Sequence, residues 1–317
     1  MNVSKLRNYR LMMDDTVRMD AYHRAIEATC SGQTVCEIGV GLGPLSLMAL
    51  RAGAARVYGV EIDAEVLEAA TVVIRANGFG PDRFIPIVGL STQVVLPERV
   101  DVLLSETLDS MGIGENTSRY MTDAKERLLK PGGVMLPARL DCYAALSTPE
   151  TYKSECRFWN KDMEDYGLSY APLLPQIRGV KHTIPITDDD LQSAWQCWQQ
   201  NDFAVQTTYP TLATLALEVL TAGEVHGLAL AFDAALCDDV NIRTFPSDPT
   251  THWLQGFAPF PQGPIQVRIG DLVYVELHFS QQDNPSLTWQ LRVASGPAAD
   301  VAAYMRERLA QMVAGQG

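Results

Sequence analysis

Two glutamates on one predicted loop carry the strongest chemical signal in the sequence. Residues 105–115 read SETLDSMGIGE and follow the apolar run VDVLL, which places Glu106 and Glu115 nine residues apart on a small, glycine-containing loop. Carboxylates at this spacing can converge on one planar cation, because each can accept paired N–H bonds from a guanidinium. Two solvated loop acids are the alternative, and the loop alone does not decide between these interpretations.

A glycine-rich turn ends the first predicted strand. The segment EIGVGLG places Gly39, Gly41 and Gly43 after Glu37, so that a ligand can lie against bare backbone at the carboxyl edge of a sheet. Pro44 follows directly and removes one backbone N–H that a pyrophosphate would need at the start of a helix. The turn therefore favours a nucleoside ligand without a pyrophosphate.

A third carboxylate lies where such a ligand would need one. Glu61 ends the next predicted strand, VYGVE, eighteen residues after Gly43. At this place in a strand–helix–strand unit, a carboxylate can accept hydrogen bonds from both hydroxyls of a ribose. A solvated strand end is the alternative interpretation of Glu61.

The elements that must position these residues alternate between strands and helices in the first half of the chain. Residues 4–30 have apolar side chains at helical spacing and predict one or two helices. The short runs TVCEI, RVYGVE, FIPIV and VDVLLSE are apolar on both faces, as buried parallel strands are, and helical segments separate the first three of them. Residues 33–137 therefore predict a doubly wound, Rossmann-like α/β sheet.

The pattern changes after residue 137. Strand-like runs such as TLALEVL, GLALAFDAAL and IQVRIGDLVYVELHFS are separated by Pro, Gly and Asp turns, and a helical segment, VAAYMRERLAQMVAG, comes last. This texture predicts antiparallel, β-barrel-like structure. The expected division is N-terminal helices over 1–32, the α/β domain over 33–137 and the β domain over 138–317.

Composition excludes several classes of function. The 317 residues are 47% hydrophobic, enough for two globular domains, and the net charge of −13 opposes binding of nucleic acid and favours cationic ligands, although solubility alone could also account for it. Six scattered cysteines form no C-x-x-C pair, so we expect neither a metal site nor a disulfide framework. Without an apolar leader or an ~18-residue apolar span, we expect a soluble, cytoplasmic protein with no membrane partner.

Four separated blocks resemble the protein arginine methyltransferases. They are MMDDTVRMDAY near the start, EIGVGLG with VYGVE, the loop SETLDSMGIGE, and the downstream triplet THW at 251–253. Their order and spacing also agree with that family, and the resemblance covers roughly residues 9–290. It implies a class I methyltransferase domain, an attached β-barrel and S-adenosylmethionine as the cofactor.

The resemblance also implies roles for individual residues. Arg18 would pair with the carboxylate of the cofactor, Glu61 would take its ribose, and four residues of the turn would hold its methionyl part: Glu37, Gly39, Gly41 and Gly43. Glu106 and Glu115 match the two glutamates that bind the guanidinium. The remaining matches surround the acceptor: Met12 lining the active site, Trp253 walling the substrate channel, and His252 paired with Asp15.

Three departures from the family pattern shape our expectations. Thr107 and Asp109 inside the loop look most like the monomethylating, type III branch, in which Asp109 would help bind the substrate. The glutamate that usually contacts adenine falls at Thr92 or Gln93. Only eleven residues precede Met12, so we expect the N-terminal helix that covers the cofactor to be short or absent.

The expected reaction is methylation of arginine in a protein or peptide, giving mainly monomethylarginine. The guanidinium, whose pKa exceeds ~12, stays charged until attack, and its proton leaves late, either to Glu115 or through the Asp15–His252 pair. A methyltransferase of natural-product metabolism that accepts a free guanidine, amine or hydroxyl is the first alternative, and a catalytically silent scaffold is the second.

The resemblance further implies an assembly. Residues 152–175 interrupt the β region with aromatic and apolar side chains where the family has a dimerisation arm. Exposing Phe158, Trp159, Tyr166 and Tyr170 on a monomer would be unfavourable, so we expect a homodimer.

Overall fold

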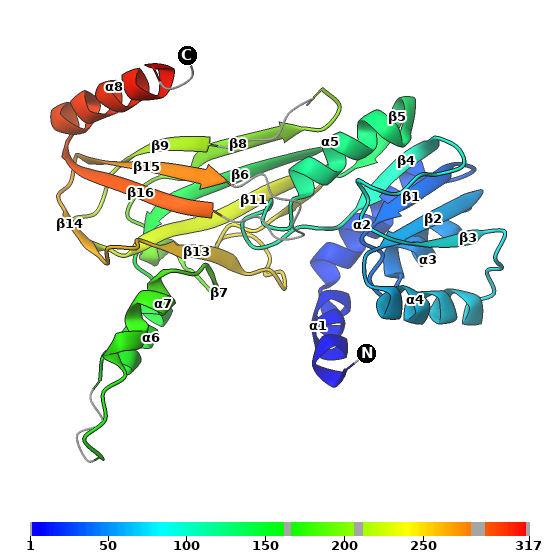
Figure 1. The fold of residues 1–317 in the computed structure, drawn as a ribbon, viewed down its shortest axis with the longest axis horizontal. Coiled ribbons are helices and arrows are strands. Elements are labelled where there is room, and N and C mark those ends of the chain that lie inside the picture. The colour runs from blue at the N-terminus through cyan, green and yellow to red at the C-terminus, as the bar shows by residue number, and fades with distance from the viewer. Residues whose placement is uncertain (1, 162–165, 206–211, 280–288, 315–317) are drawn as a thin grey trace.

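The computed structural model describes residues 2–161, 166–205, 212–279 and 289–314. Its first part is a parallel five-stranded sheet in the order β3-β2-β1-β4-β5, and the second part is built from antiparallel sheets (Figure 1). The expected Rossmann-like sheet followed by antiparallel β structure is therefore confirmed.

Ten helices and strands form the first part. They are α1 (Val3–Asp14), α2 (Thr16–Thr29), β1 (Thr34–Ile38), α3 (Pro44–Arg51), β2 (Arg56–Glu61), α4 (Ala64–Ala76), β3 (Phe84–Val88), β4 (Val100–Ser105), α5 (Thr117–Arg127) and β5 (Leu129–Leu136). The central strands β1, β2 and β4 are buried along almost their whole length, which is why their sequences are apolar on both faces. Strand order reverses beside β1, and the carboxyl ends of β1 and β4 there carry the glycine turn and the double-glutamate loop.

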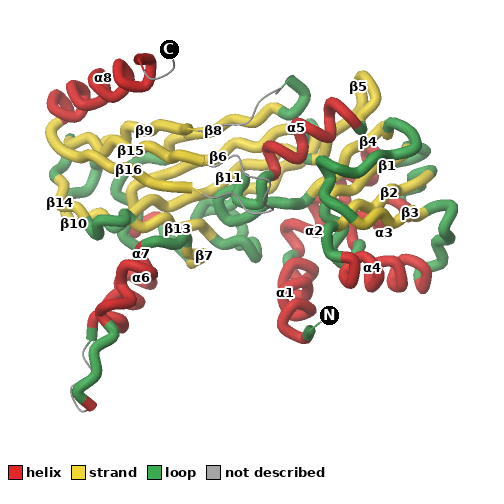
Figure 2. The backbone as a smooth tube through the Cα atoms, viewed as in Figure 1, coloured by secondary structure: helices red, strands yellow, loops and turns green. Residues whose placement is uncertain are grey.

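The second part begins within three residues of the end of the parallel sheet. Its strands are β6 (Arg139–Ser147), β7 (His182–Ile184), β8 (Gln196–Asp202), β9 (Leu212–Glu218), β10 (Gly223–Val225), β11 (Gly227–Cys237), β12 (Val240–Arg243), β13 (Gln255–Pro259), β14 (Ile265–Val267), β15 (Asp271–Phe279) and β16 (Trp289–Pro297). Among the described residues, β7-β13-β11-β6-β8 and β16-β15-β9 form two sheets, and Figure 2 shows their strands, in yellow, in the part of the molecule next to the parallel sheet. The division at 32/33 and 137/138 stays a prediction.

Short helices complete the second part. An arm of α6 (Glu150–Asn160), the 3-10 turn η2 (Ala171–Leu173) and α7 (Leu174–Arg178) projects away from the sheets, while the 3-10 turn η3 (Asp188–Asp190) lies on the way to β8 (Figure 1). The last helix, α8 (Ala298–Ala314), packs on β15 and β16 at the end of the molecule distant from the parallel sheet. One buried core runs through both parts and includes Leu103 of β4 and Leu230 of β11.

Helix α1 corrects one expectation. We expected a short or absent N-terminal helix, but α1 has 12 residues, and the side chain of Asn2 caps it by accepting the N–H of Lys5 at 2.9 Å. Counting residues before Met12 was misleading because α1 begins at Val3 and continues past Met12 to Asp14. The helix lies against the glycine turn and contributes residues to the cavity described below.

No helix in the described part of the chain is long and apolar enough to cross a bilayer. The six cysteines all fall within the described residues and are unpaired.

Candidate active site

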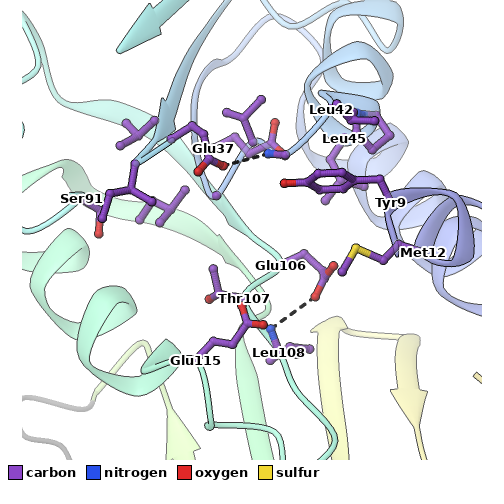
Figure 3. A pocket seen from close by; sticks show the side chains of 18 of the residues that line it. Tyr9, Met12, Glu37, Leu42, Leu45, Ser91, Glu106, Thr107, Leu108 and Glu115 are labelled. Atoms are coloured by element: carbon purple, nitrogen blue, oxygen red, sulfur yellow. Dashed lines mark hydrogen bonds between the residues drawn. The ribbon is translucent and has the colours of Figure 1, made fainter. Parts of the chain in front are cut away.

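A cavity of about 380 Å³ opens at the carboxyl ends of β1, β2 and β4, under α1. Figure 3 shows Tyr9 and Met12 reaching into it from α1, with Glu37 on one side and Glu106 and Glu115 on the other. Its lining brings together most of the side chains that the sequence singled out: Met12, Arg18, Glu37, Gly39, Gly41, Glu61, Glu106 and Glu115. Residues from five separate segments thus meet in one space.

The glycine turn leaves room for a ligand because Gly41 has a φ of +54° and no side chain. A Cβ at this position would lie 3.0 Å from the ring of Tyr9. Gly43 does not line the cavity; it begins α3 at a φ of +83° and faces Ile74 of α4 instead. A side chain here would meet α4, so glycine lets the turn pack closely against that helix, and a contact of Gly43 with the cofactor stays a prediction.

Two carboxylates flank the turn. The Oε2 atom of Glu61 accepts the N–H of Gly41 at 3.0 Å and its Oε1 atom accepts the N–H of Asp63 at 3.1 Å, which fixes the carboxylate while leaving further lone pairs for ribose hydroxyls. Glu37 is 1% exposed and accepts the hydroxyl of Ser46. Burial raises the pKa of Glu37 to about 8, so a cationic amino group placed beside it would be strongly favoured.

The side of the cavity expected to hold adenine differs from the prediction. Gly89, Leu90 and Ser91 line it, whereas Thr92 and Gln93 are not among its lining residues. The hydroxyl of Ser91 is buried and has no hydrogen-bond partner within the described residues. Such a group at a cavity wall fits a hydrogen-bonding ligand.

Arg18 and Glu106 form a buried ion pair in the middle of the site. The Nε and Nη2 atoms of Arg18 donate to Oε2 of Glu106 at 2.9 and 2.5 Å, and Nη1 donates to the carbonyl of Met12 at 3.2 Å. Both side chains are less than a tenth exposed. The resemblance gave Arg18 a role toward the cofactor and Glu106 a role toward the acceptor. In the structure the two side chains are paired with each other.

Glu115 lies in a more acidic environment. Burial, Glu106 and Asp109 raise its pKa to about 7, and only Lys181 acts in the opposite direction among its strongest neighbours. At neutral pH the carboxyl group is therefore close to its titration midpoint. A bound guanidinium would favour the ionised form and would donate hydrogen bonds to it.

Asp15 and His252 are paired, as the resemblance implied. His252 Nδ1 lies 2.8 Å from Asp15 Oδ2, which also accepts the backbone N–H of His252 at 2.8 Å. Burial raises the pKa of Asp15, but hydrogen bonds from His252 and from the N–H of Arg18 outweigh that effect and leave it below its usual range. The pair also caps α2 and so ties that helix to the β domain.

Trp253 and Asp109 lie outside the cavity lining. The indole of Trp253 donates to the carbonyl of Leu108 at 2.9 Å, so the ring supports the loop from behind. The carboxylate of Asp109 is turned away from the cavity and binds Lys181 and two backbone N–H groups of its own loop. These partners hold the carboxylate within its own loop, and a role of Asp109 in binding the substrate stays a prediction.

Sequence reasoning missed several contributors. Lys5, Asn8 and Tyr9 reach the cavity from α1. Burial, together with Glu61 and other nearby carboxylates, raises the pKa of the Tyr9 hydroxyl to about 12. Only the helical spacing with Met12 could have indicated Tyr9. No group of three or more His, Cys, Asp or Glu side chains in the described segments is arranged to hold a metal ion.

Comparison with known proteins assigns the chain to a family, although no protein-family model matches it. The chain is 31% identical over 280 residues to the arginine N(omega)-methyltransferase of Streptomyces achromogenes subsp. streptozoticus, covering 85% of this chain and 75% of that protein. It is 30% identical over 309 residues to the probable histone-arginine methyltransferase 1.4 of Arabidopsis thaliana, covering 91% of this chain and 58% of that protein. The histone-arginine methyltransferase CARMER of Anopheles gambiae is 32% identical over 278 residues, with 83% and 44% covered. The chain thus spans about half the length of these two histone-arginine methyltransferases.

Solved structures support the fold. The Trypanosoma brucei PRMT1 enzyme-prozyme heterotetrameric complex with AdoHcy matches with a TM-score of 0.76 and 23% identity, covering 92% of this chain and 94% of that chain. Protein arginine methyltransferase 10 of Arabidopsis thaliana matches with a TM-score of 0.73 and 22% identity, again covering 92% and 94%. With the relatives above, these likenesses show that the chain belongs to the protein arginine methyltransferase family, whose enzymes depend on S-adenosylmethionine.

Proposed function

We propose that the protein transfers a methyl group from S-adenosylmethionine to a guanidinium nitrogen of arginine in a protein or peptide. The observation that carries this proposal is one cavity that joins a nucleoside-type glycine turn to two glutamates on the double-glutamate loop. A metal-free nucleophilic displacement needs only that the acceptor nitrogen and the methyl group be held in line.

The residues present fit the cofactor. A Cβ at Gly41 would crowd the ring of Tyr9 at the cavity wall, Glu37 is a buried carboxylate suited to an amino group, and the buried hydroxyl of Ser91 is available to a hydrogen-bonding ligand. When bound, S-adenosylmethionine supplies a methyl group on a positively charged sulfur. Glu61 would hold its ribose, and Arg18 would hold its carboxylate while keeping its ion pair with Glu106.

The two loop glutamates would bind and orient the acceptor. Glu106 and Glu115 can each accept N–H bonds from the guanidinium, which localises its charge and leaves one terminal nitrogen facing the methyl group. Glu115 is the stronger candidate to accept the departing proton, because its pKa is raised to about 7, whereas Asp15 is held ionised by His252 outside the cavity lining.

Two finer features of the proposal rest on resemblance. We propose monomethylarginine as the main product, supported by the likeness of the loop to the type III branch and by the side chains of Met12 and Thr107, which limit space beside the glutamates. We also propose a homodimer joined through the arm. The cytoplasmic location stays a prediction.

The identity of the acceptor defines the test. Methyl-labelled cofactor is incubated with an arginine peptide, with the same peptide carrying lysine in place of arginine, and with free arginine, followed by mass spectrometry. Monomethylation confined to the arginine peptide is expected. The Streptomyces relative is named for arginine and not for a protein, so free arginine is the second candidate acceptor. Methylation of the lysine peptide, or of no compound, would exclude the proposal, and early dimethylarginine would exclude the monomethyl product.

A further inference from the structure

The carboxylate of Asp109 is enclosed between its own loop and a lysine from the β domain. Its Oδ1 atom accepts the N–H groups of Met111 and Gly114 at 3.1 and 2.8 Å, and its Oδ2 atom accepts the ammonium of Lys181. The side chains of Asp109 and Lys181 are each 18% exposed. Asp109 and Lys181 thus form a largely desolvated ion pair, although they lie 72 positions apart in the sequence. Gly114, whose N–H binds Asp109, directly precedes Glu115.

The position of Asp109 determines the course of the loop just before Glu115. A Cβ at Gly114 would lie 2.0 Å from Oδ2 of Asp109, so the carboxylate occupies the space that any side chain at 114 would need. The N–H of Gly114 is bound to the same carboxylate, so Asp109 holds the Ile113–Gly114 peptide, one residue before Glu115. A change at Asp109 therefore reaches the catalytic carboxylate directly.

Lys181 connects this loop to the base of the arm. It lies between α7 and β7, and its ammonium also donates to the hydroxyl of Ser110 at 2.6 Å. Ser110 is in turn 3.1 Å from the hydroxyl of Thr183 on β7. Without Lys181, the charge of Asp109 would face Glu106 and Glu115 uncompensated.

We infer that Lys181 is a positioning residue for the proposed methyl transfer: its pairing with Asp109 fixes the loop between the two glutamates and balances the charge of Asp109 next to Glu115. The inference rests on the proposed function. Lys181 does not line the cavity, so it acts through Asp109 and not on the substrate.

The surroundings of Glu115 set the direction of each expected effect. The charged and titratable groups that face it come from its own loop and from three other elements: Glu106, Asp109, Glu61, Lys181 and Tyr9. Glu106 is already paired with Arg18. Asp109 raises the pKa of Glu115 and Lys181 lowers it, so removing one or the other charge must move the titration of Glu115 in opposite directions.

The test measures kcat/KM for the arginine peptide from about pH 5.5 to 9.5, together with cofactor affinity by calorimetry and thermal unfolding. The variants are Lys181→Met, Asp109→Asn, the double change, and the conservative Lys181→Arg. Lys130→Met is the matched control, because Lys130 is also paired with an aspartate but lies at the edge strand β5.

Lys181→Met should move the ascending limb of the profile to higher pH and lower kcat/KM at pH 7 by about tenfold, with cofactor affinity unchanged. Asp109→Asn should move the limb to lower pH, the double variant should lie between, and Lys181→Arg should resemble the wild type. The inference is overturned if Lys181→Met keeps the wild-type limb, or if both single variants shift it in the same direction. If Lys181→Met does not fold, an unshifted limb in Asp109→Asn overturns it. Inactive wild type on every arginine substrate would instead refute the proposed function.

Discussion

Glu115 is the residue whose ionisation should govern the rate near neutral pH. Its pKa is raised to about 7 by burial and by neighbouring acids, so the free protein gains the acceptor carboxylate only as pH rises through that value. We expect kcat/KM to rise through about pH 7, while the limb for kcat lies lower because a bound guanidinium favours the ionised carboxylate.

The raised pKa of Glu115 also affects stability. Its contribution decreases as pH rises, whereas the contribution of a carboxylate in a salt bridge, whose pKa is lowered, increases as pH rises. Because the folded chain holds the Glu115 proton more tightly than the unfolded chain, its contribution to the free energy of unfolding declines from about pH 4.5 to about 7. Initial-rate profiles for the wild type and Glu115→Gln check the rate, and urea unfolding of the same two proteins between about pH 4.5 and 7 checks the stability. A flat kcat/KM between about pH 6 and 8 in the wild type would contradict the assignment.

Substitution of either glutamate should reduce methyl transfer much more than cofactor binding. Glu115→Gln should lower methyl transfer at least about a hundredfold, since losing one partner of a desolvated charge pair costs roughly 3–5 kcal/mol, and cofactor affinity should stay within about twofold. Glu106→Gln should lose transfer as well, and it should reduce stability because Arg18, 4% exposed, then lacks its partner. Near-normal turnover in Glu115→Gln would show that no guanidinium is held there.

At the residue scale, the sequence predicted the groups that belong to local motifs. Glu37, Glu61 and Glu106 stand at or next to strand ends, where topology decides which edge they share, and Glu115 follows on the same loop as Glu106. The orientation of Asp109 was not predictable in this way, because Lys181 is 72 residues distant and its position depends on how the arm returns to the sheet.

At the element scale, α1 should act as one wall of the cofactor site. The ring of Tyr9 lies over Gly41, and we expect Tyr9→Ala to weaken cofactor binding about tenfold, the equivalent of about 1.4 kcal/mol of lost apolar contact. Tyr9→Phe keeps the ring and is the control, expected to bind like the wild type. Calorimetric affinities that are equal for Tyr9→Ala and wild type would remove α1 from the site.

Helix α8 is held by a buried carboxylate. Glu276 on β15 is 0% exposed and receives Nε and Nη2 of Arg308 from α8, each at 2.9 Å. Arg308→Met should lower the free energy of unfolding by about 3 kcal/mol, the lower end of the range for a broken buried pair, because His278 also binds the carboxylate. Urea unfolding measures the change, with the exposed Arg306→Met as the control.

The pH dependence of that contribution has a definite sign. Hydrogen bonds from Arg308 lower the pKa of Glu276 to about 2, so the stabilisation is present above about pH 4.5 and is lost as pH falls toward 2. Equal urea midpoints for Arg308→Met and wild type at neutral pH would show that α8 is not anchored here.

The order of strands and helices was predictable because buried parallel strands have a distinct composition, whereas the length of α1 and the packing of α8 were not. Both helices have modest amphipathic character and owe their positions to contacts with remote elements, such as α1 with the glycine turn. Such docking depends on tertiary structure, which no local pattern contains.

At the scale of the whole molecule, the arm should join two copies. Phe158, Tyr166, Leu168 and Tyr170 are all exposed on it, an arrangement that a stable monomer would rarely keep. We expect light scattering at micromolar concentration to give twice the mass of one chain, and Phe158→Asp to give a single chain. A monomeric wild type with full activity would contradict the homodimer.

The hydrogen bond between Asp15 and His252 also constrains the order of events during synthesis. It joins positions 237 residues apart, and contacts of such long range form late because the intervening chain must first be ordered. A growing polypeptide that ends before residue 252 lacks the imidazole that fastens α2 to the β domain and the indole that supports the loop. We expect the proposed methyl transfer to be withheld from such unfinished chains, because the acceptor side of the site is assembled only after Trp253 has been made.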